Sequence, residues 1–263
     1  MRSLLIRRKM DSRPIGVFDS GIGGISLMRN MIRLLPGEDF IYYGDEKHAP
    51  YGTKSEEEIL ALSLNVVDFL LKHDVKAIVI ACNTATSAAA KPLRSSLSLP
   101  IIGIEPALKP AQLERKNGGI AVLATPATLR QNKFLSLMKL YGEGAIPVPC
   151  PGLMEFVERG ITEGEELDVF LNKTLEPLKE IELDGAVLGC THYSFLARAI
   201  SKALRGVRLY DGNEGTARQL KRVLEEKGLL SVKQKGTVSL YTSSDSSAAI
   251  ALMQTLLLKP IEL

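Results

Sequence analysis

The sequence predicts an α/β fold made of two similar lobes, each built around a parallel sheet with helices on its faces. Short runs of β-branched and other apolar residues alternate with longer amphipathic segments, which is the pattern of parallel strands joined by helices. Two of these runs end in a cysteine followed by a polar turn, and the runs before each cysteine recur at similar intervals. Two lobes related by a pseudo-two-fold axis would therefore place the cysteines on opposite walls of one cleft.

The expected strands are the short apolar runs. They cover residues 15–18, 40–43, 77–80, 101–104, 120–124, 146–148, 186–188, 207–210 and 238–242. A strand that ends in a small nucleophilic or basic group places that group at the carboxyl edge of the sheet, where open α/β folds bind their ligands. The residues directly after the strands are therefore the first candidates for a functional site.

The clearest helix is predicted over residues 56–73. Its apolar side chains fall on one stripe, formed by Ile59, Leu62, Val66, Phe69 and Leu70. Ser55 and Glu58 have the spacing of a capping box at its start. Further helices are expected to open near Gly24, Ala127 and Phe195, and to cover residues 216–227 and the C-terminal end.

The two halves of the chain align when their cysteines are superposed. Phe18, at the end of the first strand, precedes Cys82 by nearly as many residues as Ala124 precedes Cys190. We expect residues 14–104 to form the first lobe, with 212–263 returning to complete it, and 105–211 to form the second. Residues 1–13 are interpreted as a flexible extension.

Composition excludes several classes of function. The net charge of +3 over 263 residues, without a basic cluster beyond the first ten positions, does not indicate a nucleic-acid partner. No apolar run approaches the roughly 18–20 residues that span a bilayer, and no signal peptide is recognisable, so neither a membrane partner nor export is expected. A sparse, odd set of three cysteines is typical of a reducing compartment, and the protein is expected to be cytoplasmic.

Cys82 and Cys190 are the candidate catalytic groups. A thiol with an ordinary pKa near 8.5 can act as acid or base, and each cysteine is followed by polar residues that a core would not favour. A buried structural cysteine is the alternative for both, and it is the interpretation preferred for Cys150. The absence of a Cys-x-x-Cys motif and the scattered histidines indicate no metal site.

Three other polar segments follow strands. The turn from Asp19 to Gly24 contains Ser20 and three glycines, whose exposed N–H groups suit an anion, but its spacing is not that of a dinucleotide fingerprint. Asp19 is either a helix cap or a group that holds or deprotonates a neighbour. His192, two positions after Cys190, can polarise a thiol or bond the backbone. Residues 50–52 form a loop that could close over a ligand.

These motifs, in this order, resemble those of a known family. Asp-Ser-Gly-Ile-Gly-Gly, Pro-Tyr-Gly, Ala-Cys-Asn-Thr-Ala and Leu-Gly-Cys-Thr-His-Tyr are similar to the motifs of glutamate racemases, in the cofactor-independent aspartate/glutamate racemase family. The resemblance covers nearly the whole chain from about residue 14. It implies two flavodoxin-like lobes with the active site between them, and a reaction in which one cysteine removes the α-proton of glutamate and the other protonates the opposite face.

The resemblance also implies a role for each matching residue. Cys82 and Cys190 would be the acid/base pair, with Asp19 assisting the first and His192 the second. Glu158 would be the acidic residue near Cys190, with Glu155 as a competitor. The residues that would bind substrate are Asp19, Ser20, Tyr51, Gly52, Asn83, Thr84, Thr125, Thr128, Thr191 and His192.

The sequence departs from the family pattern in three places. Pro126 and two alanines stand in a segment that usually reads Gly-Thr-x-Gly-Thr, which puts the roles of Thr125 and Thr128 in question. His48 stands where a cysteine often precedes Pro-Tyr-Gly, and residues 211–214 differ from the usual Asp-Ser-Gly-Ala-Glu. The family further implies no cofactor, a homodimer, and a supply of D-glutamate for peptidoglycan.

Other functions compete with this one. An aspartate racemase or a related epimerase is the nearest, although Thr191-His192 after the second cysteine favours glutamate. A thiol–disulfide redox protein would also present two cysteines, and a two-lobed binding module would also have a cleft. A pyridoxal enzyme would need a Schiff-base lysine, and no lysine here has a comparably distinctive setting.

Overall fold

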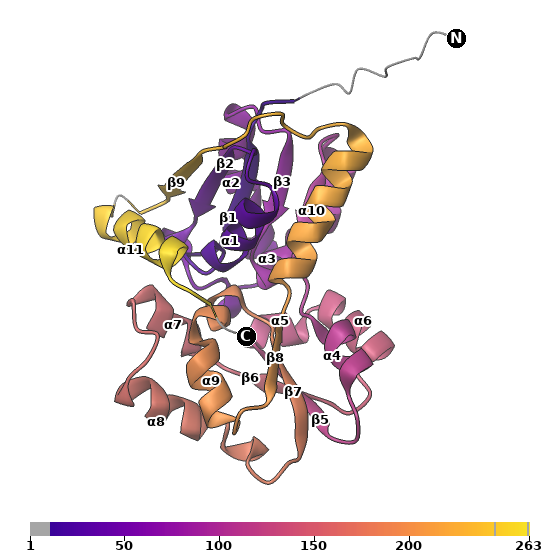
Figure 1. The fold of residues 1–263 in the computed structure, drawn as a ribbon, viewed down its shortest axis with the longest axis vertical. Coiled ribbons are helices and arrows are strands. Elements are labelled where there is room, and N and C mark those ends of the chain that lie inside the picture. Colours follow the sequence, from indigo (N-terminus) through magenta and orange to yellow (C-terminus); the bar gives the residue numbers. More distant parts are fainter. Residues whose placement is uncertain (1–10, 245, 262) are drawn as a thin grey trace.

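The computed structural model describes residues 11–244, 246–261 and 263, which form two lobes, each with its own parallel sheet (Figure 1). In the first lobe the strand order is β4-β3-β1-β2-β9, and every pairing is parallel. These strands are β1 (Ile15–Asp19), β2 (Phe40–Gly44), β3 (Ala77–Ile80), β4 (Ile101–Gly103) and β9 (Val238–Thr242).

The second sheet has the order β6-β5-β7-β8, again with parallel pairing throughout. Its strands are β5 (Gly119–Ala124), β6 (Ala145–Pro149), β7 (Leu183–Leu188) and β8 (Arg208–Asp211). In each sheet the first strand of the lobe lies centrally, next to the strand that leads to a cysteine. The predicted fold class, two α/β lobes with parallel sheets, is confirmed.

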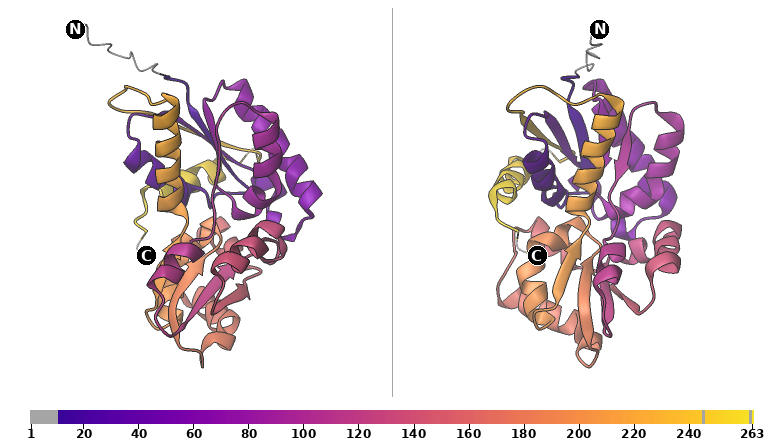
Figure 2. Two further views of the ribbon diagram at one scale, coloured as in Figure 1. Left: turned by 90° about the vertical axis from the view of Figure 1, so that its right-hand side faces the viewer. Right: turned by 45° about the vertical axis from the view of Figure 1, so that its right-hand side comes forward.

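Helices cover both faces of the first sheet (Figure 2). Along β1 the side chains of Ile15 and Val17 join the apolar core beneath α1, whereas Phe18 joins the core beneath α2 and α3. This alternation follows from the two-residue repeat of a strand. The helices of this lobe are α1 (Ile25–Leu34), α2 (Glu56–Lys72), α3 (Asn83–Ser96), α10 (Asn213–Lys227) and α11 (Ser247–Leu258).

The second lobe has shorter helices, interrupted by turns. Its α-helices are α4 (Leu108–Glu114), α5 (Pro126–Arg130), α6 (Asn132–Tyr141), α7 (Leu153–Glu158), α8 (Glu165–Thr174) and α9 (Ala197–Ala203). The 3₁₀ segments of the chain are Glu46–His48, Tyr51–Thr53, Glu176–Leu178 and Thr191–Leu196. The helix expected near Phe195 therefore begins as a 3₁₀ turn directly after Cys190.

Local sequence explains where α2 begins. The Ser55 hydroxyl accepts the Glu58 N–H at 3.2 Å, and the Glu58 carboxylate accepts the Ser55 N–H at 2.9 Å, so the capping box is present. Another long helix, α10, starts at Asn213 rather than at residue 216 and ends at Lys227. The next residue, Gly228, adopts the left-handed conformation that favours glycine.

The chain returns to the first lobe after crossing the second. β9 pairs with β2 at the edge of the first sheet, and α10 and α11 pack on α1. Most of the predicted N-terminal extension, residues 1–10 of 1–13, lies outside the described residues, whereas the Asp11 carbonyl accepts a hydrogen bond from Lys76. No helix of the described part of the chain is long and apolar enough to cross a membrane.

Candidate active site

A narrow cavity lies where the carboxyl ends of the central strands of the two lobes meet. The first lobe contributes Ser20, Gly52, Cys82, Asn83 and Thr84 to its lining; the second contributes Thr125, Met154, Gly189, Cys190, Thr191 and His192. Cys82 and Cys190 thus reach one cavity from opposite lobes. Asp19, Thr128 and Glu158 do not line it but contact residues that do. Tyr51 does not line it either, and precedes Gly52 in the chain.

Cys82 follows β3 and caps the N-terminus of α3. Its sulfur accepts the Ala85 N–H at 3.4 Å, and its thiol donates to the Ser20 hydroxyl at 3.6 Å, which in turn donates to Asp19 at 3.2 Å. Burial, together with the negative charge of Asp19, raises the pKa of the Cys82 thiol to about 12. Cys82 is therefore a neutral thiol at neutral pH.

Cys190 stands at the start of a different chain of groups. Nδ1 of His192 lies 3.6 Å from its sulfur, and Nε2 of the same ring lies 2.6 Å from the Glu158 carboxylate. Burial opposes a charge on His192, yet the contacts with Cys190 and Glu158 raise its pKa well above the ordinary value. The exposed Glu155 has no such contact, so Glu158 is the residue that orients His192.

Asp19 lies behind the cavity wall and is fully buried. It accepts hydrogen bonds from the Gly21 N–H at 3.0 Å and, across the lobe boundary, from the Thr191 hydroxyl at 2.8 Å. Burial raises its pKa, and the nearby His192 opposes this. Asp19 therefore influences Cys82 electrostatically and through Ser20, rather than by direct contact.

Three threonines join the lobes at the other end of the cavity. The Thr84 hydroxyl, from the start of α3, lies 3.2 Å from that of Thr125 and 2.9 Å from that of Thr128. The departure from the family pattern leaves this arrangement intact, because Pro126 occupies the first turn of α5 and Thr125 caps the helix. The amide of Gln131 also crosses the boundary and donates to the Thr84 carbonyl.

The loop that contains residues 50–52 reaches the cavity through Gly52. A side chain at this position would clash with Thr125, since an added Cβ would lie 2.9 Å from the Cβ of that residue. Tyr51 is buried behind the loop, and its hydroxyl donates to the buried Asp45 carboxylate at 2.6 Å. Close packing against Thr125 of the other lobe therefore requires glycine at position 52, and the sequence alone does not show this contact.

The sequence predicts that the turn after β1, from Asp19 to Gly24, offers its N–H groups to an anion. In the structure, two of these groups are already bonded within the protein. The Gly21 N–H bonds Asp19, and the Ile22 N–H bonds the Glu158 carboxylate at 3.0 Å, so carboxylates of the protein itself occupy two of its donors. Met154 and Gly189 line the cavity although neither is among the predicted site residues; Gly189 belongs to the Leu-Gly-Cys-Thr-His-Tyr motif, whereas Met154 belongs to none. Met154 lies on α7, whose only sequence signal was its acidic residues, and Gly189 packs against Ala124, where a Cβ would clash.

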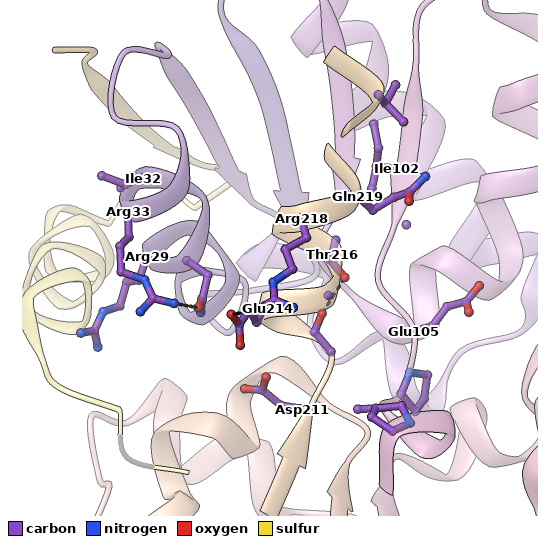
Figure 3. Close-up of a pocket in the computed structure, with 18 of the residues that line it drawn as sticks. Arg29, Ile32, Arg33, Ile102, Glu105, Asp211, Glu214, Thr216, Arg218 and Gln219 are labelled. Carbon is purple, nitrogen blue, oxygen red and sulfur yellow. Dashed lines mark hydrogen bonds and ion pairs between the residues drawn. The ribbon is translucent and has the colours of Figure 1, made fainter. Parts of the chain in front are cut away.

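A second and much larger hollow lies at the lobe junction, and neither Cys82 nor Cys190 lines it (Figure 3). Arginines and glutamates surround it and partly neutralise one another, as Arg218 and Glu214 do at 2.6 Å. Among the residues that the structure describes, no three His, Cys, Asp or Glu side chains gather as metal ligands would. The cavity with the two cysteines is therefore the candidate active site.

Comparison with known proteins agrees with this geometry. The sequence profile of the family described as Asp/Glu/Hydantoin racemase matches residues 15–220. The chain belongs to this family. Like its relatives, it is an amino-acid racemase, an isomerase.

Individual members of the racemase family match over almost their whole length. A glutamate racemase of Clostridium novyi (strain NT) is 52% identical over 242 residues, which are 90% of this chain and 93% of the relative. The structure of glutamate racemase from Thermus thermophilus in complex with β-chloro-D-alanine is 37% identical, with a TM-score of 0.82 and 96% of each chain covered. That of glutamate racemase from Francisella tularensis in complex with D-glutamate is 30% identical, with a TM-score of 0.81 and 95% of each chain covered.

Proposed function

We propose that this racemase interconverts L- and D-glutamate by a two-base mechanism in which Cys82 and Cys190 act on opposite faces of the α-carbon. The observation that carries the proposal is that the two thiols enter one cavity from opposite lobes. The relatives named glutamate racemase, and the D-glutamate bound to one of them, support glutamate as the substrate. Aspartate is the nearest competitor.

The chemistry requires one proton to leave and another to arrive. A thiolate on one side takes the α-proton, so that the C–H bond breaks, an S–H bond forms and the electron pair remains on the substrate. The thiol on the other side then gives its proton to the opposite face of the α-carbon. An enzyme accelerates this step by stabilising the carbanionic state more strongly than the substrate.

The two thiols have different neighbours. With a pKa raised to about 12, Cys82 is protonated at neutral pH and is poised to donate. Its conversion to a base is helped by the ammonium group of the substrate, since a nearby positive charge favours a thiolate. On the other wall, His192 stands where it can exchange a proton with Cys190, and Glu158 stabilises the imidazolium.

The remaining cavity residues have the donors and acceptors that an amino acid needs. Asn83 lines the cavity, is 5% exposed, and its Oδ1 has no partner in the described structure, so we assign it to the substrate ammonium group. Hydroxyl and backbone N–H groups suit the carboxylates. We assign this binding to the lining residues Ser20, Gly52, Thr84, Thr125, Thr191 and His192, with Asp19, Tyr51 and Thr128 behind them.

Further parts of the proposal rest on the family resemblance. We propose that the enzyme uses no cofactor, acts in the cytoplasm as a homodimer, and supplies D-glutamate for peptidoglycan. Rescue of a bacterial strain that requires D-glutamate tests the last point, and sedimentation of the purified protein tests the dimer. A monomer at working concentration would contradict the assembly but leave the chemistry standing.

Proton exchange provides the decisive experiment. The purified chain, reduced and without added cofactor, is incubated in D₂O with L- or D-glutamate while optical rotation and α-deuteration are followed. Both enantiomers should racemise with deuterium at the α-carbon. Cys82→Ser and Cys190→Ser should each lower the rate by at least about 100-fold, the scale of a lost general acid or base.

Cys150→Ser is the matched control. Cys150 is buried outside the cavity, where its thiol donates to the Val148 carbonyl, a contact that a serine can reproduce. This variant should keep its activity. Full racemisation by either cavity variant would refute the two-base assignment, and faster turnover of aspartate than of glutamate would change the substrate.

A further inference from the structure

The turn between β1 and α1, called here the glycine turn (residues 20–24), touches the acid/base groups of the opposite lobe. A Cβ added to Gly23 would lie 2.2 Å from Nδ1 of His192, and a Cβ added to Gly21 would lie 2.1 Å from Oε1 of Glu158. Neither glycine has a positive φ, so the backbone would accept other residues. Close contact with His192 and Glu158, rather than conformation, requires glycine at both positions.

Hydrogen bonds reinforce this contact. The Ile22 N–H donates to Oε1 of Glu158 at 3.0 Å, and the same oxygen lies 2.6 Å from Nε2 of His192. One turn further along, the Ser26 hydroxyl donates to the Thr191 carbonyl at 3.0 Å. The first lobe therefore holds the segment that carries His192 in two ways. It binds the backbone carbonyl of Thr191, and it binds Glu158, the carboxylate partner of His192.

We propose that the glycine turn is a positioning element that aligns the Glu158–His192–Cys190 chain, so that the Cys190 half of the site is complete only when the two lobes are packed together. Gly21 and Gly23 are positioning residues in this scheme, because they act through Glu158 and His192 and do not line the cavity. The inference rests on the proposed racemase mechanism and deepens it.

Electrostatics give a reason for such an arrangement. The His192 side chain is 1% exposed, and the titratable groups that face it are Glu158 from α7, Asp19 from the end of β1 and the Cys190 thiol. An imidazolium–carboxylate contact is stronger in a buried setting than in water. Separation of the lobes would admit water and remove the Ile22 donor, so the proton-transfer chain would be strong only in the closed arrangement.

The titration of His192 tests the proposal without reference to activity. The chain has three histidines, so imidazole NMR signals can be assigned with the variant His192→Asn. Gly23→Ala should lower the His192 pKa towards its ordinary value, because the methyl group forces the ring away from Cys190 and Glu158. Gly215→Ala is the matched control, since nothing lies within 4 Å of an added Cβ there, and it should leave the titration unchanged.

Activity supplies the second measurement. Gly23→Ala should lower kcat by about 100-fold in both directions, the scale expected when a catalytic group moves by an ångström. In the His192→Asn variant, Gly23→Ala should lower kcat by less than about a further threefold, because the two changes act on one group. Additive losses would show that Gly23 acts independently of His192 and would overturn the proposal.

A second variant keeps the test usable if Gly23→Ala does not fold. In Gly21→Ala the new methyl group meets the end of the Glu158 side chain, which can turn aside, and the His192 pKa should again fall. An unchanged His192 titration in the folded variants would refute the inference. Absence of racemisation by the unmodified protein would instead refute the proposed function, and the titration would still be readable.

Discussion

Asp19 raises the pKa of Cys82 even though the two side chains are not in contact. Its carboxylate is linked to the thiol through the Ser20 hydroxyl, and its charge adds to the effect of burial. Asp19 also binds the Thr191 hydroxyl, next to the other cysteine. One buried carboxylate therefore makes Cys82 harder to ionise and fixes a residue of the opposite wall.

Replacement of Asp19 separates these two effects. Asp19→Asn should speed alkylation of Cys82 by iodoacetamide about tenfold at pH 8, since one unit of pKa corresponds to tenfold more thiolate. It should also slow racemisation, because Thr191 loses its charged acceptor. Rates come from peptide mass spectrometry, with the exposed Asp68→Asn as control. Slower alkylation of Cys82 in Asp19→Asn would contradict this account of its pKa.

The strands agree with their sequence patterns where the pattern is continuous. The predicted ranges 77–80 and 238–242 match β3 and β9, whereas β7 begins at Leu183 rather than at residue 186. The missed start contains Asp184, whose carboxylate accepts the N–H groups of Lys116 and Gly118 across the lobe. Asp184 interrupts the apolar run in the sequence without ending the strand. Its hydrogen-bond partners are far away in the sequence, so the sequence alone does not show that a polar residue can be accommodated there.

A buried ion pair ties together three elements of the first lobe. Lys76, just before β3, lies 2.5 Å from the Glu38 carboxylate before β2, and both side chains are almost fully buried. Lys76 also donates to the Asp11 carbonyl at 2.6 Å, and Glu38 accepts the Ser231 N–H at 2.7 Å from the segment that leads to β9. The return of the chain to this sheet therefore depends partly on this pair.

Lys76→Met should lower the free energy of unfolding by about 3–5 kcal/mol, because it leaves Glu38 buried without its counter-charge. Urea denaturation measures the loss. Replacing both partners, as in Lys76→Met with Glu38→Leu, should recover a large part of it, since no lone charge then remains buried. The exposed pair Lys202–Asp168 is the control, and Lys202→Met should change stability by less than about 1 kcal/mol. Equal effects at the two lysines would refute the role of burial.

At the scale of the whole molecule, the sequence predicts the lobes better than the contacts between them. Strand-end motifs place Cys82, Cys190 and their neighbours at sheet edges, because that position depends on local pattern. The contact between Ile22 and Glu158 depends on how one lobe sits on the other. No periodicity encodes that relation. The sequence pattern therefore indicates an anion-binding turn, whereas in the structure the turn receives a carboxylate of the same chain.

The same burial that shapes the active site should make the molecule sensitive to alkali. The pKa values of Cys82 and Cys150 are both raised to about 12, chiefly by burial, whereas a thiol of the unfolded chain titrates near 8.5. Above about pH 8.5 the unfolded chain therefore releases protons that the folded chain keeps, and stability falls as pH rises. His192 acts in the same direction from about pH 6.5, because its folded pKa is also raised.

Urea unfolding between pH 7 and 10.5 should show this loss, about 1.4 kcal/mol per pH unit for each thiol once the unfolded thiols ionise. Cys150→Ala isolates one contribution outside the active site: the variant is less stable at pH 7 because a buried group is removed, but its stability should fall less steeply above pH 8.5. Parallel curves for the two proteins would show that Cys150 does not resist ionisation in the folded state. In the double variant Cys82→Ser/Cys150→Ala, both thiols with a raised pKa are absent. Any loss of stability with rising pH that remains there is assigned to other buried groups, of which His192, Tyr42 and Tyr193 are the candidates, since the pKa of each is also raised.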